Sequence, residues 1–127
     1  MQKIVIETTD APKPIGPYSQ AVWLGNTLFV SGQVAINPTT NEMYNGGDIK
    51  EETRAVMNNL QGILTAAGMD FSHVIKCSIF IADMNQFASI NEVYGGYFTA
   101  PYPARETVEV RRLPKDAQIE ISIIAAK

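Results

Sequence analysis

Alternation of apolar and polar residues predicts most of the strands in this chain. In "PARETVEV", residues 103–110, Val108 and Val110 fall on one side of an extended chain while Arg105 and Thr107 fall on the other. Further strands are predicted at residues 4–7, on both sides of the hairpin signal Gly25-Asn26, and at residues 74–82 and 118–126.

Apolar residues spaced three and four apart predict two helices. The first begins at Asp48, which can cap the helix N-terminus while Glu51 reaches back in a capping-box spacing, and it ends near Gly68. Its predicted buried stripe comprises Ile49, Thr53, Val56, Leu60, Ile63, Leu64 and Ala67. The second helix covers about residues 85–98 and places on one side Phe87, Ile90, Tyr94, Tyr97 and Phe98, although Gly95-Gly96 weakens its last turn.

The order of these elements predicts an α+β fold in a single domain, residues 1–127, with one mixed sheet and both helices packed on one face. In "AQIEISIIAA" the isoleucines at 119, 121 and 123 face one side of the sheet, whereas Glu120, Ser122 and Ile124 face the other. The second face of the sheet would then be partly apolar and uncovered. We therefore expect several copies of the chain to associate through that face, which would cover its apolar side chains.

Composition and charge narrow the function classes. The net charge is −3 and no cluster of basic residues occurs, so nucleic acid is a disfavoured partner. No apolar run is long enough for a signal peptide or a membrane span, which predicts a soluble, cytoplasmic protein without membrane contact. The single cysteine, Cys77, lies in an apolar strand, where we expect it to pack in the core.

Few side chains suit catalysis. His73 is the only histidine, and the turn "SHVIK" favours a surface or capping role for it, so we expect no metal site. Neither "GQVAINP" nor "YNGGDIK" has the pattern of a phosphate-binding loop. Glu51 and Glu52 lie at a helix start, where we interpret both as solvated charges.

Arg105 and Glu120 remain as candidates on the last two predicted strands. They could form a salt bridge between adjacent strands, since cross-strand charge pairs are common. Alternatively, the planar guanidinium of Arg105 holds the carboxylate of a ligand while Glu120 handles a proton or a water. The pattern of residues alone leaves both interpretations open.

Four segments of this chain, in order, resemble one known family. They are "IGPYSQAV" at 15–22, "LFVSGQVAINP" at 28–38, "NLQGILTAAGMDFSHVIKCSIFIADM" at 59–84 and "YPARETVEVRRLPKDAQIEISIIA" at 102–125. Together they are similar to the reactive-intermediate deaminases, the family called RidA, YjgF or L-PSP. The resemblance covers nearly the whole chain.

That resemblance implies a chorismate-mutase-like α+β fold, a homotrimer and active sites in clefts between subunits. It also implies hydrolysis of enamines and imines, such as 2-aminoacrylate and 2-aminocrotonate, to 2-oxo acids and ammonia, without cofactor or metal. Arg105 matches the arginine that grips the substrate carboxylate, and Glu120 matches the acid that orients or activates water. Matching pocket positions are Tyr18, Ser31, Gly32 and Asn91. An aromatic ring packed over a loop and an amide on a helix surface are the alternatives for Tyr18 and Asn91.

The sequence departs from the family pattern after Arg105. Glu106 stands where a small or apolar residue is usual, and Thr107 stands where cysteine is frequent in close relatives. By strand alternation Glu106 points away from Arg105, whereas Thr107 shares its face and could affect ligand fit. Substrate preference therefore stays open.

Relatives have been given two other functions, RNA cleavage and a chaperone-like or small-molecule-binding role. Cleavage of RNA is disfavoured by the acidic composition and by the absence of a histidine pair. A chaperone-like or small-molecule-binding role is harder to separate, because Arg105 would hold a 2-oxo acid with or without turnover. Only Glu120 points to catalysis.

Overall fold

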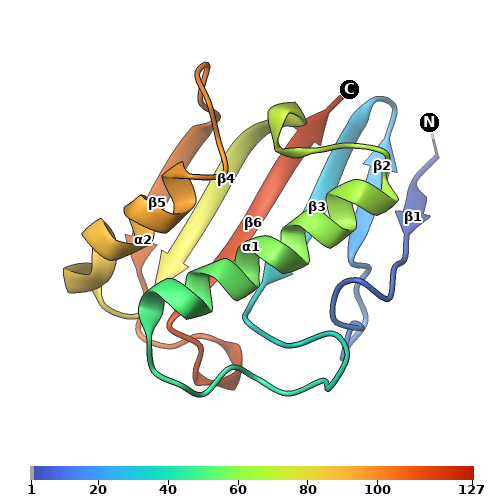
Figure 1. The fold of residues 1–127 in the computed structure, drawn as a ribbon. Coiled ribbons are helices and arrows are strands. Elements are labelled where there is room, and N and C mark those ends of the chain that lie inside the picture. The colour runs from blue at the N-terminus through green and yellow to red at the C-terminus, as the bar shows by residue number, and fades with distance from the viewer. Residues whose placement is uncertain (1) are drawn as a thin grey trace.

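The computed structural model describes residues 2–127, which form a six-stranded sheet with two helices on one face (Figure 1). The strands are β1 (Ile4–Ile6), β2 (Ala21–Leu24), β3 (Thr27–Gln33), β4 (Val74–Ile81), β5 (Ala104–Glu109) and β6 (Ile119–Ala126). They lie in the order β1-β2-β3-β6-β4-β5, and only the β4–β5 pair is parallel. The predicted α+β class, with a mixed sheet and its helices on one side, is confirmed.

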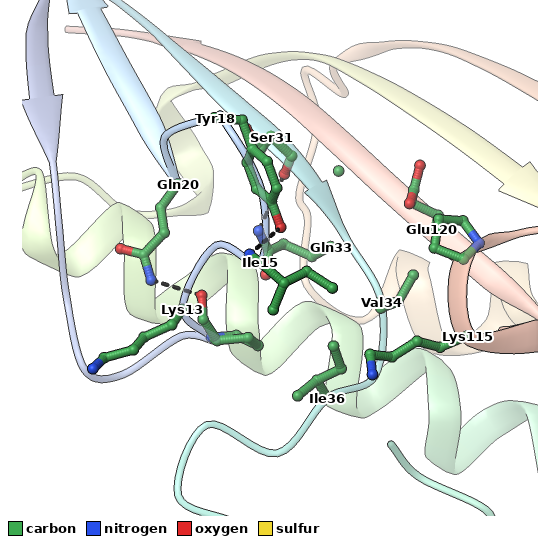
Figure 2. A pocket seen from close by; sticks show the side chains of 13 residues that line it. Lys13, Ile15, Tyr18, Gln20, Ser31, Gln33, Val34, Ile36, Lys115 and Glu120 are labelled. Carbon is green, nitrogen blue, oxygen red and sulfur yellow. Dashed lines mark hydrogen bonds between the residues drawn. The ribbon is translucent and has the colours of Figure 1, made fainter. Parts of the chain in front are cut away.

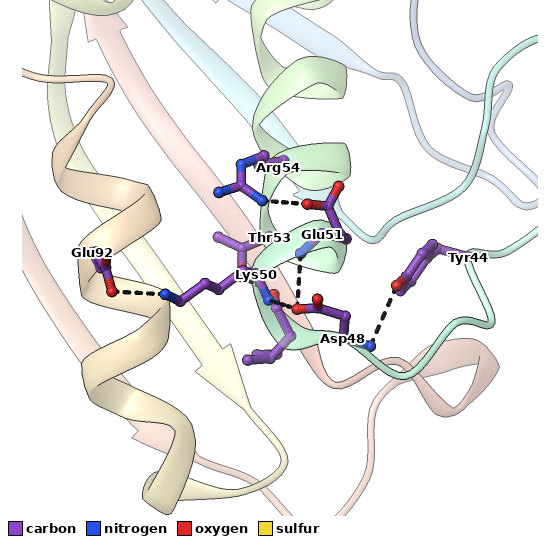
Figure 3. Close-up of polar contacts among 8 residues, drawn as sticks. Tyr44, Asp48, Lys50, Glu51, Thr53, Arg54 and Glu92 are labelled. Carbon is purple, nitrogen blue, oxygen red and sulfur yellow. Dashed lines mark hydrogen bonds and ion pairs between the residues drawn. The ribbon is translucent and has the colours of Figure 1, made fainter.

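Helix α1 (Ile49–Ala66) begins where the sequence predicts. The Asp48 carboxylate accepts from the backbone N–H groups of Lys50 and Glu51, which caps the helix (Figure 3). The predicted contact of the Glu51 side chain with the backbone N–H of Asp48 is wrong. Glu51 pairs with Arg54 instead, and the backbone N–H of Asp48 donates to the Tyr44 hydroxyl at 3.3 Å.

The core lies between α1 and the sheet. Six of the seven predicted stripe residues are buried, and Ala67 is half-buried. The interpretation of Glu52 as a solvated charge is wrong, since its side chain is 3% exposed. Its carboxylate accepts from the backbone N–H and the side-chain amide of Gln118, at 2.7 and 3.0 Å, and so ties α1 to the residue before β6.

Helix α2 (Phe87–Gly95) is shorter than the predicted 85–98. A 3-10 turn, Met84–Gln86, precedes it after the Asp83 side chain accepts from the backbone N–H of Asn85. The helix stops at Gly95-Gly96, where two consecutive glycines make continuation costly. A salt bridge from Lys50 to Glu92, at 2.8 Å, joins the two helices (Figure 3).

The sheet face opposite the helices is uncovered in the chain. Ile119, Ile121 and Ile123 are buried toward the helices, while the alternate positions of β6 are only half-buried, as predicted. On this open face the exposed fractions of Phe29 and Val108 are 42% and 41%. Exposed apolar side chains on one sheet face are typical of a surface that associates.

Strand β3 contains a β-bulge beside β6. Val30 pairs with Ile123 and Gln33 with Ile121, so Ser31 and Gly32 together oppose the single residue Ser122. Bulges bend a strand locally and re-aim its side chains, and they are frequent beside binding sites.

Candidate functional site

Glu120 lies at a cavity of about 430 Å³ next to the bulge of β3. Tyr18, Ser31 and Gly32, three of the predicted pocket residues, line the same cavity. Figure 2 shows Tyr18 and Ser31 on one side of this space and Glu120 on the other. The structure thus brings together four of the predicted site residues, although they come from a loop and two different strands.

Gly32 allows the Glu120 side chain to lie against β3. A Cβ atom at position 32 would come within 2.8 Å of both Cδ and Oε1 of Glu120, which is closer than real contacts allow. Glycine therefore lets the Glu120 carboxyl lie close to the β3 backbone, and a larger residue would make that carboxyl shift.

Burial changes the acidity of Glu120. Desolvation raises the pKa of this carboxyl above its ordinary value of 4.5. No residue between 2 and 127 places a cation within salt-bridge distance of it. A carboxyl with a raised pKa and a cavity in front of it is suited to exchange protons with a ligand or water.

The loop that carries Tyr18 is held from beneath by Gln20. The buried Gln20 amide donates to the carbonyls of Thr8 and Pro12 at 3.0 and 2.9 Å, and its oxygen accepts from the backbone N–H of Thr8 at 2.8 Å. The Ser31 hydroxyl donates to the Ser19 carbonyl at 2.6 Å. These contacts fix both ends of the loop and leave Tyr18 exposed at the cavity.

Arg105 lies elsewhere, on the edge strand β5 beneath α2. Its guanidinium donates to the Asn91 side-chain oxygen at 2.7 Å. The same guanidinium stands 5.0 Å from the centre of the Tyr94 ring and 5.5 Å from that of Phe87. Asn91 therefore lies half-buried on the face of α2 toward Arg105.

The two groups of residues lie on opposite faces of the sheet. Arg105 is in register with Cys77 and Ile123, which point toward the helices, whereas Glu120 is in register with Phe80 and Val108 of the open face. Strand β4 also separates β5 from β6. The salt bridge considered for Arg105 and Glu120 is therefore wrong, and within one chain these side chains cannot act on one ligand.

The residues after Arg105 follow the predicted alternation. Glu106 lies on the open face, where it pairs with Ser78 and with Lys76 at 3.2 Å, and these contacts lower the pKa of its carboxyl. Thr107 is in register with Ile79 on the helix face, the face of Arg105. Its hydroxyl oxygen is buried and has no hydrogen-bond partner among the described residues.

Other candidates have structural roles. His73 Nδ1 accepts from the backbone N–H of Asp70 at 3.0 Å, which confirms the capping role, and Cys77 is buried in the core. Within residues 2–127, no group of three His, Cys, Asp or Glu side chains could hold a metal ion. No helix in that range is long and apolar enough to cross a membrane.

Several residues around the two groups were not predicted. Gln33 and Lys115 line the cavity of Glu120, and Lys115 has a left-handed backbone with φ of 56°. Phe87 and Tyr94 flank Arg105. Glutamines inside the apolar runs "SQAV" and "SGQV" were the available signal for Gln20 and Gln33, whereas no pattern marks a left-handed lysine.

Known proteins are similar to this chain in sequence and in fold. The family described as Endoribonuclease L-PSP matches residues 8–127. A RutC family protein of Pyrococcus horikoshii is 55% identical over 98% of both chains. A 2-iminobutanoate/2-iminopropanoate deaminase of Mus musculus is 45% identical over 97% of this chain and 90% of its own. The solved structure of E. coli TdcF with bound serine has a TM-score of 0.92 at 44% identity and covers 98% of both chains. On its sequence and its fold, this chain belongs to the RidA/YjgF/L-PSP family.

Proposed function

We propose that this protein hydrolyses small 2-imino acids and their enamine forms, such as 2-aminoacrylate and 2-aminocrotonate, to 2-oxo acids and ammonia. The mouse relative bears the name of this activity. The proposal rests on two groups that the chain displays at separate places: a guanidinium held by Asn91, and a half-buried carboxyl facing a cavity. A 2-imino acid needs both, one for its carboxylate and one for water.

The site is assembled between two copies of the chain. Arg105 lies on an edge strand, and Glu120 lies on the open sheet face, so the edge of one copy can meet the open face of the next. A head-to-tail contact that closes into a ring gives every copy one site. We propose a homotrimer, the assembly that the family resemblance implies, with its apolar sheet faces turned inward.

In the mechanism, Arg105 binds the substrate carboxylate with two parallel hydrogen bonds. Glu120 takes a proton from a bound water as the water oxygen bonds to the protonated imine carbon, and it passes that proton to the nitrogen. The C–N bond then breaks and releases ammonia while Glu120 removes the hydroxyl proton, which leaves the 2-oxo acid, and the proton passes from Glu120 to ammonia or solvent. A protonated imine carbon is already a good electrophile, so positioning and this proton transfer suffice without a cofactor or metal. The remaining contacts are assigned to Tyr18, Ser31, Gly32, Asn91 and Thr107.

Binding of 2-oxo acids without turnover is the second candidate. The E. coli relative TdcF was solved with bound serine, itself a small carboxylate. The raised pKa of Glu120 favours turnover over simple binding, because an anion-binding site gains nothing from a buried carboxyl. Cleavage of RNA is the less favoured alternative despite the description of the family, since the chain carries a net charge of −3 and one histidine.

The test is ammonia release from 2-aminoacrylate generated in place by a dehydratase. We expect the purified protein to accelerate the release in proportion to its concentration, and Glu120→Gln to abolish the acceleration. If the wild-type protein binds pyruvate but leaves the rate unchanged, the binding candidate is correct and the deaminase proposal is wrong.

A further inference from the structure

We infer that Tyr94, together with Phe87, positions Arg105 by presenting aromatic rings on which its guanidinium rests. This inference deepens the proposed function, because it assigns to α2 the aiming of the group that binds the substrate carboxylate. Neither ring needs to touch the substrate, so both are positioning residues.

The distances place the guanidinium against both rings. Its central carbon lies 5.0 Å from the centre of the Tyr94 ring and 5.5 Å from that of Phe87, inside the range of about 6 Å for cation–π attraction. Phe87, Asn91 and Tyr94 follow one another at steps of four and three, so they share one face of α2. Three contacts from one helix face hold a single side chain.

The Tyr94 ring is itself fixed. It is buried, it packs against the Phe98 ring at 4.7 Å between centres, and it lies on the same helix face as Asn91. A buried ring that packs against a second ring has little room to follow the arginine. The guanidinium must therefore adapt to the ring.

This arrangement matters because arginine has a long, flexible side chain. Asn91 accepts through one terminal nitrogen of Arg105, and among residues 2–127 no carboxylate pairs with the guanidinium. The other N–H groups are thus available to a ligand. Holding the fork in one plane before the ligand arrives removes an ordering cost from binding.

The experiment measures the dissociation constant of pyruvate by calorimetry, and the KM for 2-aminoacrylate, in Tyr94→Leu, Tyr94→Phe and Tyr97→Leu. Tyr94→Leu should weaken binding and raise KM about three- to thirty-fold, and Tyr94→Phe should recover most of the loss because it keeps the ring. Tyr97 is the matched control, since its ring contacts Phe71 and not Arg105. We expect Tyr97→Leu to keep the wild-type constants whatever it does to stability.

A second comparison separates positioning from general damage. In an Arg105→Lys background, where no planar fork remains to be aimed, Tyr94→Leu should change the pyruvate constant by less than about two-fold. If Tyr94→Leu does not fold, Phe87→Leu at the half-buried ring replaces it, with the same expectation. If a folded Tyr94→Leu or Phe87→Leu protein keeps the wild-type dissociation constant and KM, the inference is wrong and the proposed function stands. If the wild-type protein neither binds pyruvate nor accelerates ammonia release, the proposed function is wrong as well.

Discussion

Glu120, the proposed catalytic carboxyl, should lower the stability of the native state at neutral pH. Burial raises its pKa, so the native state binds a proton at this carboxyl more readily than the unfolded state does. For a raised pKa the contribution to stability is complete below the unfolded value, taken as the ordinary 4.5, and is lost as the pH rises through the native value. We predict that Glu120→Gln is at least as stable as wild type at pH 7, although it is inactive.

Thermal unfolding of both proteins at pH 7 and pH 3.5 checks this prediction. The advantage of Glu120→Gln should disappear at pH 3.5, where the wild-type carboxyl is protonated in both states. A variant that is clearly less stable than wild type at pH 7 would show that the Glu120 charge supports the fold.

A substitution at Gly32 tests whether the position of the Glu120 carboxyl matters, without changing Glu120 itself. Because a Cβ would come within 2.8 Å of Glu120, we predict that Gly32→Ala displaces the carboxyl and lowers kcat/KM about ten-fold or more. Gly95→Ala is the control, since its Cβ would meet open space and alanine favours the helix. Unchanged kinetics in Gly32→Ala would mean that the position of Glu120 in the structure is not the active one.

For single residues, the sequence predicts which way a side chain points better than it predicts which distant residues lie next to it. Alternation correctly separates Glu106 from Thr107, because side-chain direction in a strand depends on nothing beyond the strand. It cannot show that β4 lies between β5 and β6, since strand order is decided by how distant segments pack. The contacts of Arg105 with α2 likewise depend on how distant segments pack, so the strand pattern does not predict them.

Among the elements, α1 is attached to the start of β6 by a buried carboxylate. Glu52 accepts two hydrogen bonds from Gln118, two residues before Glu120. We predict that Glu52→Ala lowers the free energy of unfolding by about 1.5–3 kcal/mol, because it leaves the Gln118 N–H without its charged acceptor. Denaturant titration measures the change.

Glu51→Ala is the neighbouring control for this titration. Glu51 is exposed and, among residues 2–127, its carboxylate pairs with Arg54 alone at the helix surface, so its loss should cost no more than about 1 kcal/mol (Figure 3). Equal costs for the two substitutions would contradict the assignment of a structural role to Glu52.

Helix boundaries show what local signals can and cannot define. Asp48 and Gly68 are predicted correctly, because a capping side chain and a residue with φ of 72° act on their own backbone. The buried state of Glu52 is not predictable, since the helix pattern alone gives no reason to bury a carboxylate beside an exposed one. Its partner, Gln118, is 66 residues away.

For the whole molecule, the open sheet face predicts association of several copies, and the family resemblance implies that they number three. Light scattering should give three times the 13.9 kDa of the chain at micromolar concentration. Phe29→Asp, at an exposed apolar position of that face, should dissociate the trimer into folded monomers. Met84→Asp is the control, because Met84 is similarly exposed but lies beside α2. A monomeric wild-type protein would contradict this prediction.

The central claim is that each active site takes Arg105 from one copy and Glu120 from another, and mixing two inactive variants tests it most directly. Arg105→Ala and Glu120→Gln, unfolded together and refolded as a mixture, form rings in which some neighbours supply both native side chains. We predict that about a quarter of wild-type activity returns in an equal mixture, while each variant refolded alone stays inactive. A mixture that forms mixed trimers, shown by differently tagged chains, yet stays inactive would contradict the account.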